Sequence, residues 1–110
     1  MTTTKSKNDN QNNYEYTDME NMKRFVSQHK DTLKSTGSSR SWFVWDGMRW
    51  RYEADDVTAI QRGFMTIESI DKEASASLDS LKRQELLKWS KSSQSKHRIL
   101  SMISMASKHK

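Results

Sequence analysis

The basic side chains near the C-terminus are the first candidates for chemistry, because they could bind a polyanion. Between Lys82 and Lys110 there are eight Lys or Arg residues and a single acid, Glu85, whereas the whole chain of 110 residues carries a formal net charge of +5. Charge placed this unevenly predicts either a phosphate-binding surface or a solvated helical face with a Lys-rich tail. The cations expected to contact phosphates are Arg83, Lys88, Lys91, Lys96 and Arg98.

Stacking on a nucleobase is the second possible chemistry, and the aromatic run from Ser41 to Tyr52 could supply it. Asp46-Gly47 between two aromatic-rich stretches is typical of a β-hairpin with a two-residue turn. In that register Trp42 lies opposite Arg51. The pair predicts either a platform on which a base stacks or a Trp–Arg contact that only covers the sheet.

The alternation of side chains along a hairpin sorts this run into two faces. Because a lone two-stranded hairpin is marginal in water, helices should pack on the more aromatic face. The face expected to be buried contains Phe43, Trp45, Met48 and Trp50. The face expected to be exposed contains Trp42, Val44, Arg49 and Arg51.

Other kinds of site find little support in the sequence. The absence of Cys excludes disulfides and thiolate chemistry. The three glycines lack the spacing of a phosphate loop or a dinucleotide fingerprint, and the three histidines lack zinc-site spacing and are predicted to be surface residues. Asp55 and Asp56 suit the start of a helix. We therefore expect no catalytic residues, no metal and no cofactor. The three glycines are Gly37, Gly47 and Gly63, and the three histidines are His29, His97 and His109.

Four helices are predicted around the hairpin, over residues 18–29, 56–74, 79–91 and 96–107. Thr17 and Glu20 have the spacing of a capping box at the first of them. Gly63, inside the second, predicts a close approach by another element, such as a hairpin Trp. The expected apolar faces are Met19, Met22, Phe25 and Val26; Val57, Ile60, Phe64, Ile67 and Ala74; Leu78, Leu81, Leu86 and Trp89; and Ile99, Met102, Ile103 and Ala106.

The predicted fold is mostly α with a small β-hairpin, in which about four helices pack on the aromatic-rich two strands. Residues 1–13 are polar and are expected to form a disordered leader. Residues 14–107 should form a single helical domain with the hairpin at 42–52, and residues 108–110 a frayed basic tail. No stretch approaches the roughly 20 apolar residues of a membrane span, so a soluble intracellular protein is expected.

Three segments carry a resemblance to a known family: residues 16–26, residues 95–106 and, most specifically, the Trp-x-x-Trp-Asp-Gly-x-x-Trp pattern of residues 42–50. Together they resemble the N-terminal region of phage and plasmid primase-helicases of the poxvirus type. In that family the region precedes a superfamily 3 helicase domain, and similar modules help to engage template DNA. The resemblance implies either a fragment of such a protein or a free-standing relative.

Charge and resemblance together predict a replication-associated module that binds single-stranded or template DNA and is not catalytic alone. Its partners would be a helicase or primase, in cis or in trans, in the cytoplasm of a bacterial or archaeal host and away from membranes. The five cations named above would contact phosphates, and Trp42 with Arg51 would form the platform on which a base stacks. The alternative is a free-standing phage accessory protein that docks on a replication or host protein through its aromatic and Met-rich surface.

Overall fold

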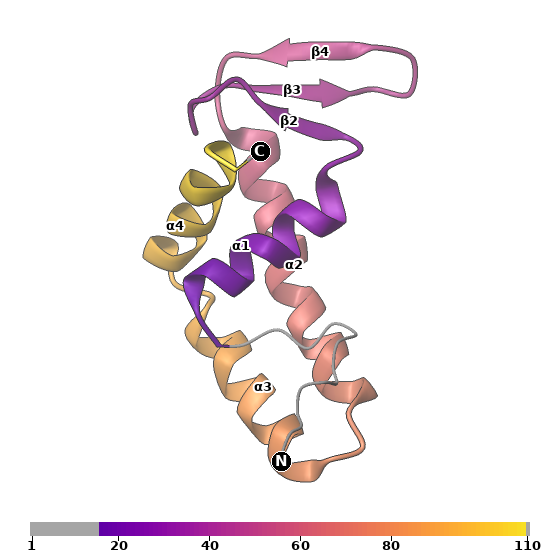
Figure 1. Cartoon of the computed structure of the whole chain (residues 1–110), viewed down its shortest axis with the longest axis vertical. Coiled ribbons are helices and arrows are strands. Elements are labelled where there is room, and N and C mark those ends of the chain that lie inside the picture. The colour runs from indigo at the N-terminus through magenta and orange to yellow at the C-terminus, as the bar shows by residue number, and fades with distance from the viewer. Residues whose placement is uncertain (1–15, 110) are drawn as a thin grey trace.

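The structure, a computed structural model, describes residues 16–109 as four helices and one small antiparallel sheet (Figure 1). The predicted class, mostly α with a small β element, is confirmed, although the sheet has three strands instead of two. The predicted leader, residues 1–13, and Lys110 of the predicted tail lie outside the described residues. The elements in chain order are α1 (Asp18–His29), β2 (Leu33–Ser35), β3 (Trp42–Trp45), β4 (Trp50–Glu53), α2 (Val57–Ala76), α3 (Ser80–Ser92) and α4 (Lys96–Ser107).

Short polar side chains set where the helices begin. The Thr17 hydroxyl accepts a hydrogen bond from the Glu20 N–H at 3.1 Å, and the Ser95 hydroxyl accepts one from the Arg98 N–H at 3.2 Å. Both bonds satisfy N–H groups that have no partner within the helix. At α2, the Asp55 carboxylate accepts from the Val57 N–H at 3.1 Å. The predicted bounds of α1 and α4 are confirmed, and α2 and α3 differ from theirs by one or two residues.

The helical core forms where α4 lies close to α2. A Cβ atom placed on Gly63 would lie 3.2 Å from Met102 Cε and 3.4 Å from Ile103 Cδ1, so the missing side chain lets α4 approach. The close approach predicted at this glycine is confirmed, but the neighbour is α4 and not a hairpin Trp. The predicted apolar face of α4 is confirmed, since its four residues are all buried.

Three of the predicted helix faces are partly wrong. Val57 and Phe64 are half exposed, because α2 turns a stripe that includes Ala59 and Gly63 towards its neighbours instead. Small side chains permit the close packing that a Phe in the same place would prevent. Met19 of α1 and Leu81 of α3 are also exposed. The residues that α2 buries are Ala59, Gly63, Thr66, Ile67, Ile70 and Ala74.

A polar network lies inside the helical body. The Arg24 guanidinium, on α1, is buried and donates to both Glu73 carboxylate oxygens on α2, at 2.6 and 2.9 Å. It also donates to the Asn21 side-chain carbonyl at 2.8 Å. Asn21 in turn accepts from the Trp89 indole N–H at 2.9 Å and donates to the Ser93 hydroxyl at 3.1 Å. These bonds join α1 to α2 and to the end of α3, so the buried charge has the partners that burial requires.

The hairpin turn differs from the predicted two-residue turn. Trp45 pairs with Trp50, which leaves four residues, 46–49, in the loop. The Asp46 carboxylate accepts hydrogen bonds from the N–H groups of Met48 and Arg49, both at 2.9 Å, and Gly47 has a positive φ, of 101°. The predicted type I′ turn would have had only two residues between the strands. The carboxylate favours the longer loop instead, because it satisfies two loop N–H groups.

The predicted faces of the hairpin are inverted, and Met48 and Arg49, each assigned to one of them, lie in the loop instead. Trp42, expected to be exposed, is 2% exposed, whereas Phe43 and Trp45, expected to be buried, are 38% and 37% exposed. The reason is β2, which the sequence prediction missed. Its Leu33 pairs with Val44 on the same side as Trp42, and the Trp42 ring packs edge-on against Phe25 of α1 at 6.4 Å. The added apolar side chain and α1 thus bury the face that holds Trp42.

Candidate nucleic-acid interface

Three of the predicted phosphate-binding residues are exposed lysines near the junction of α3 and α4. Lys88 and Lys91 lie one helical turn apart on α3, and Lys96 begins α4 after a short Ser-rich turn. Among residues 16–109, none of the three takes part in an ion pair. Their ammonium groups are therefore available to solution, which is the arrangement that phosphate binding requires.

The two predicted arginines of this region have partners within the protein. The Arg83 guanidinium donates to the Ser77 carbonyl at 2.7 Å and so spans the α2–α3 connection. The Arg98 guanidinium lies over the Trp89 ring at 4.7 Å and pairs with the Asp18 carboxylate at 3.1 Å. Both arginines position helices, and the exposed lysines are the better candidates for binding.

The predicted Trp42–Arg51 platform does not exist. Trp42 is buried, and its indole N–H donates to the Ser39 carbonyl at 2.9 Å. Arg51 pairs with Val44 across the strands instead of with Trp42. Its guanidinium is exposed and forms an ion pair of 3.4 Å with Asp46 at the hairpin turn. Trp42 therefore has a role in the core, while Arg51 stays accessible at the edge of the sheet.

The opposite side of the sheet presents an aromatic surface, and the sequence prediction placed three of its rings, Phe43, Trp45 and Trp50, in the core. We call it the outer sheet face and define it by Lys34, Phe43, Trp45, Trp50 and Tyr52. The Phe43 and Tyr52 rings meet edge-on at 5.7 Å, and the Trp45 and Trp50 rings at 5.5 Å. The Lys34 ammonium lies 4.9 Å from the centre of the Trp50 ring. Cations beside exposed rings are typical of surfaces that bind single strands.

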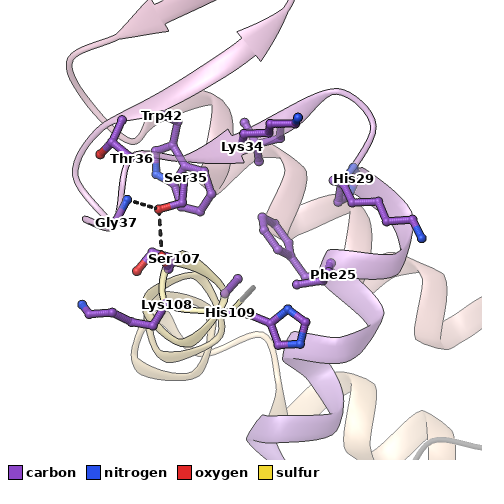
Figure 2. Close-up of a pocket in the computed structure, with 14 residues that line it drawn as sticks. Phe25, His29, Lys34, Ser35, Thr36, Gly37, Trp42, Ser107, Lys108 and His109 are labelled. Carbon is purple, nitrogen blue, oxygen red and sulfur yellow. Dashed lines mark hydrogen bonds between the residues drawn. The ribbon is translucent and has the colours of Figure 1, made fainter.

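A pocket of about 850 Å³ lies between α1, β2 and the C-terminal end of α4 (Figure 2). Phe25 and Trp42 form part of its apolar wall. Beside it the Ser35 hydroxyl accepts from the Gly37 N–H at 2.8 Å and donates to the Ser107 carbonyl at 2.9 Å, the two bonds drawn in Figure 2. These bonds join β2 to the end of α4, so this side of the sheet is attached to the helices and contributes to the stability of the fold.

His29 lies at the same pocket and is buried, so its predicted place on the surface is wrong. Its ring packs against Phe25 with the ring centres 5.2 Å apart. Burial lowers the pKa of His29 from 6.5, and the charge of Arg62 lowers this pKa further. No group in the described part of the chain bonds to Nε2 of His29. His97 and His109 are exposed, as predicted.

The described residues offer little for other kinds of site. Within residues 16–109, no group of three or more His, Cys, Asp or Glu side chains could hold a metal ion. None of the helices in this range combines the length and the apolar composition that crossing a membrane requires. The chemistry that the described residues do offer at the surface is ion pairing through Lys and Arg and stacking through exposed rings.

Comparison with protein-family models gives a match. The model of the family described as D5 N terminal like matches residues 22–109, which takes in most of α1, the whole sheet and the three later helices. Neither a curated protein nor a solved structure matches the chain significantly. The match covers well over half of the chain and agrees with the resemblance found in its Trp-rich hairpin and flanking helices. The chain therefore belongs to the D5 N-terminal-like family, the N-terminal domain of D5-like phage and plasmid primase-helicases.

Proposed function

We propose that this domain binds single-stranded or template DNA for a phage or plasmid primase-helicase and performs no catalysis by itself. The observation that carries the proposal is the exposed set Lys88, Lys91 and Lys96, which lies in a C-terminal segment with eight basic residues and one acid. Each such lysine can neutralise a phosphate and release a counterion. Membership of a replication-protein family makes DNA the fitting polyanion.

The partners and the place of action follow from the same proposal. The domain would hold DNA for a helicase or primase, joined to it in one chain or bound to it as a separate protein, in the cytoplasm of a bacterial or archaeal host. Its contribution would be recruitment and positioning, since ion pairing and stacking bind DNA without changing it.

Salt-dependent binding tests the proposal. Fluorescence anisotropy with a labelled oligo(dT) should show binding by the parent that weakens as salt rises. The Lys88→Glu/Lys91→Glu variant should bind more weakly, and its plot of log affinity against log salt should be flatter by roughly 0.7 for each phosphate that is no longer neutralised. The matched control is Lys30→Glu/Lys72→Glu, which changes the net charge equally at two exposed lysines, one directly after α1 and one on α2. Equal losses of affinity in both variants would mean that only total charge matters.

A second function, docking on another protein, is favoured by exposed apolar side chains on α2, on α3 and in the connection between them. Leu78 is almost fully exposed, and Leu81 and Phe64 are more than half exposed. Exposed apolar side chains that gather into patches commonly mark contacts with partners. Binding to a helicase or primase that persists at high salt, and that Leu81→Ser weakens, would support this function. The absence of DNA binding by the parent at low salt would give it first place.

A further inference from the structure

The outer sheet face is arranged as two rows of side chains. Lys34, Phe43 and Tyr52 form one row across the three strands, and Trp45 and Trp50 form the second. Strand β2 lies nearest to the helices and β4 farthest from them, so the hairpin extends away from the helical body (Figure 1). The rings are therefore exposed to solvent on a sheet whose strand β2 lies nearest to the helices.

Three of the four rings on this face are exposed. Tyr52 is 61% exposed and Phe43 and Trp45 are more than a third exposed, while the core of the same sheet relies on Trp42 and Leu33. Contiguous exposed apolar surface is a feature of binding sites rather than of ordinary monomer surfaces. Four aromatic residues gathered on one side of a small sheet thus point to a ligand with large flat faces.

The charges around the rings indicate which ligand. Lys34 lies over Trp50, and Arg49 is exposed in the turn that joins β3 to β4. Arg51, opposite Val44, lies on the other side of the sheet. The one acid of the turn, Asp46, already has partners within the protein, since its carboxylate accepts hydrogen bonds from two loop N–H groups and pairs with Arg51. The N–H bonds from Arg49 and then Met48 lower the pKa of Asp46. A face with cations around its rings complements a chain of phosphates joined to flat bases.

We propose that the outer sheet face stacks the bases of single-stranded DNA, with Lys34 and Arg49 against the backbone phosphates. This inference rests on the proposed function and adds a second site to it, distinct from the lysines near the α3–α4 junction. Exposed Tyr52 and Trp45 offer ring area to incoming bases, while the edge-on contacts with Phe43 and Trp50 hold the two rings in place. Stacking of this kind tolerates any base sequence.

Ring-deletion variants test the site. The probe is an oligo(dT) of about 12 nucleotides, within the range that small single-strand-binding domains cover. Tyr52→Ala and Trp45→Ala should each weaken binding by roughly 5- to 150-fold, the loss expected for one stacked base, with little change in the salt slope. Tyr52→Phe keeps the ring and should retain most of the affinity. Phe64→Ala is the matched control, because Phe64 is 51% exposed but lies on α2. Thermal melting verifies that each variant is folded.

An abasic oligonucleotide of the same length completes the test, because it keeps the phosphates and removes the bases. The parent should bind it more weakly than Tyr52→Ala binds oligo(dT), because that variant keeps the Trp45 ring, and Tyr52→Ala should bind the abasic oligonucleotide about as well as the parent does. Parent-like binding of oligo(dT) by both ring variants would overturn the stacking site while leaving the proposed function intact. Parent protein that binds no oligonucleotide at low salt would overturn both. Should Trp45→Ala fail to fold, Tyr52→Ala decides the outcome, since its side chain is the most exposed of the four rings.

Discussion

The helical body and the sheet use their side chains in opposite ways. In the helical body Arg24 is 1% exposed and Asn21 is fully buried, although both are polar. On the sheet, Phe43, Trp45 and Tyr52 are exposed, although all three are aromatic. Burial in this domain therefore follows the available partners more than the residue type. Arg24 finds a carboxylate and an amide inside, whereas no helix in the described part of the chain covers the outer sheet face.

This division also separates stability from binding. The buried network of Arg24, Asn21 and Glu73 joins helices and uses its polar atoms within the protein. The exposed rings contribute less to folding, because most of their area stays in water in the free protein. Substitutions in the two regions should therefore have separable effects, which measurements of unfolding can detect.

Arg24→Ala should have the largest effect on stability. The substitution leaves Glu73 and Asn21 without their buried partner, and breaking a buried pair typically costs about 3 to 5 kcal/mol. Urea unfolding followed by circular dichroism measures the change. The control is Lys23→Ala, whose exposed side chain pairs with Glu20 on the same helix and should cost less than about 1 kcal/mol. Similar changes in the two variants would show that the network does not stabilise the helical body.

Trp42→Ala comes next and compares the two sides of the sheet directly. Removing this buried ring leaves a cavity beside Phe25 and should cost about 3 kcal/mol, at the lower end of the range for a buried aromatic. Tyr52→Ala, on the outer face, should cost less than about 1 kcal/mol. Thermal melting of both variants measures the difference. A larger destabilisation by Tyr52→Ala would mean that the outer face is the buried one.

Gly63 tests how closely α2 and α4 pack. Gly63→Leu should destabilise by about 1 to 3 kcal/mol, because a large side chain would meet Met102 and Ile103 of α4. Gly63→Ala should change stability by less than about 1 kcal/mol, since its gain in helix propensity opposes the tight contact with the flexible Met102. Chemical unfolding of the two variants distinguishes them. A neutral Leu variant would contradict the close approach.

Local signals predicted the elements whose environment is local. The bounds of α4 follow from Ser95 at its start and from Ile99, Met102 and Ile103 at helical spacing. The D5 N-terminal-like family was likewise recognisable from the Trp-rich hairpin with its flanking helices. In both cases residues near in sequence carry the whole signal, so the pattern alone was sufficient.

The side of the hairpin that is buried depends on contacts distant in sequence. Alternation sorts Phe43 from Trp42, but either face could have met the helices. The decision comes from Leu33, in a strand of three residues too short to give a pattern, and from Phe25 on α1. In the same way, packing against α4 determines that the small residues of α2 are the buried ones. The Asp46 carboxylate likewise determines the length of the hairpin loop. The candidate stacking surface was missed for this reason, while the exposed lysines of α3 and α4 were predictable from charge.

The smallest expected effect is the pH dependence that buried His29 adds to stability. Burial and the charge of Arg62 lower the pKa of His29 below 6.5 in the folded protein. The unfolded chain therefore binds a proton at pH values where the folded protein keeps this ring neutral. The resulting stability is fully present above about pH 6.5 and is lost as the pH falls from there through the lowered pKa.

Urea unfolding between about pH 7.5 and pH 5.5 should show a shallower decline of stability for His29→Gln than for the parent. His97→Gln, at an exposed position, should keep the parent's decline. Parallel curves for the parent and His29→Gln would show that His29 is as accessible to water as the exposed rings of the sheet.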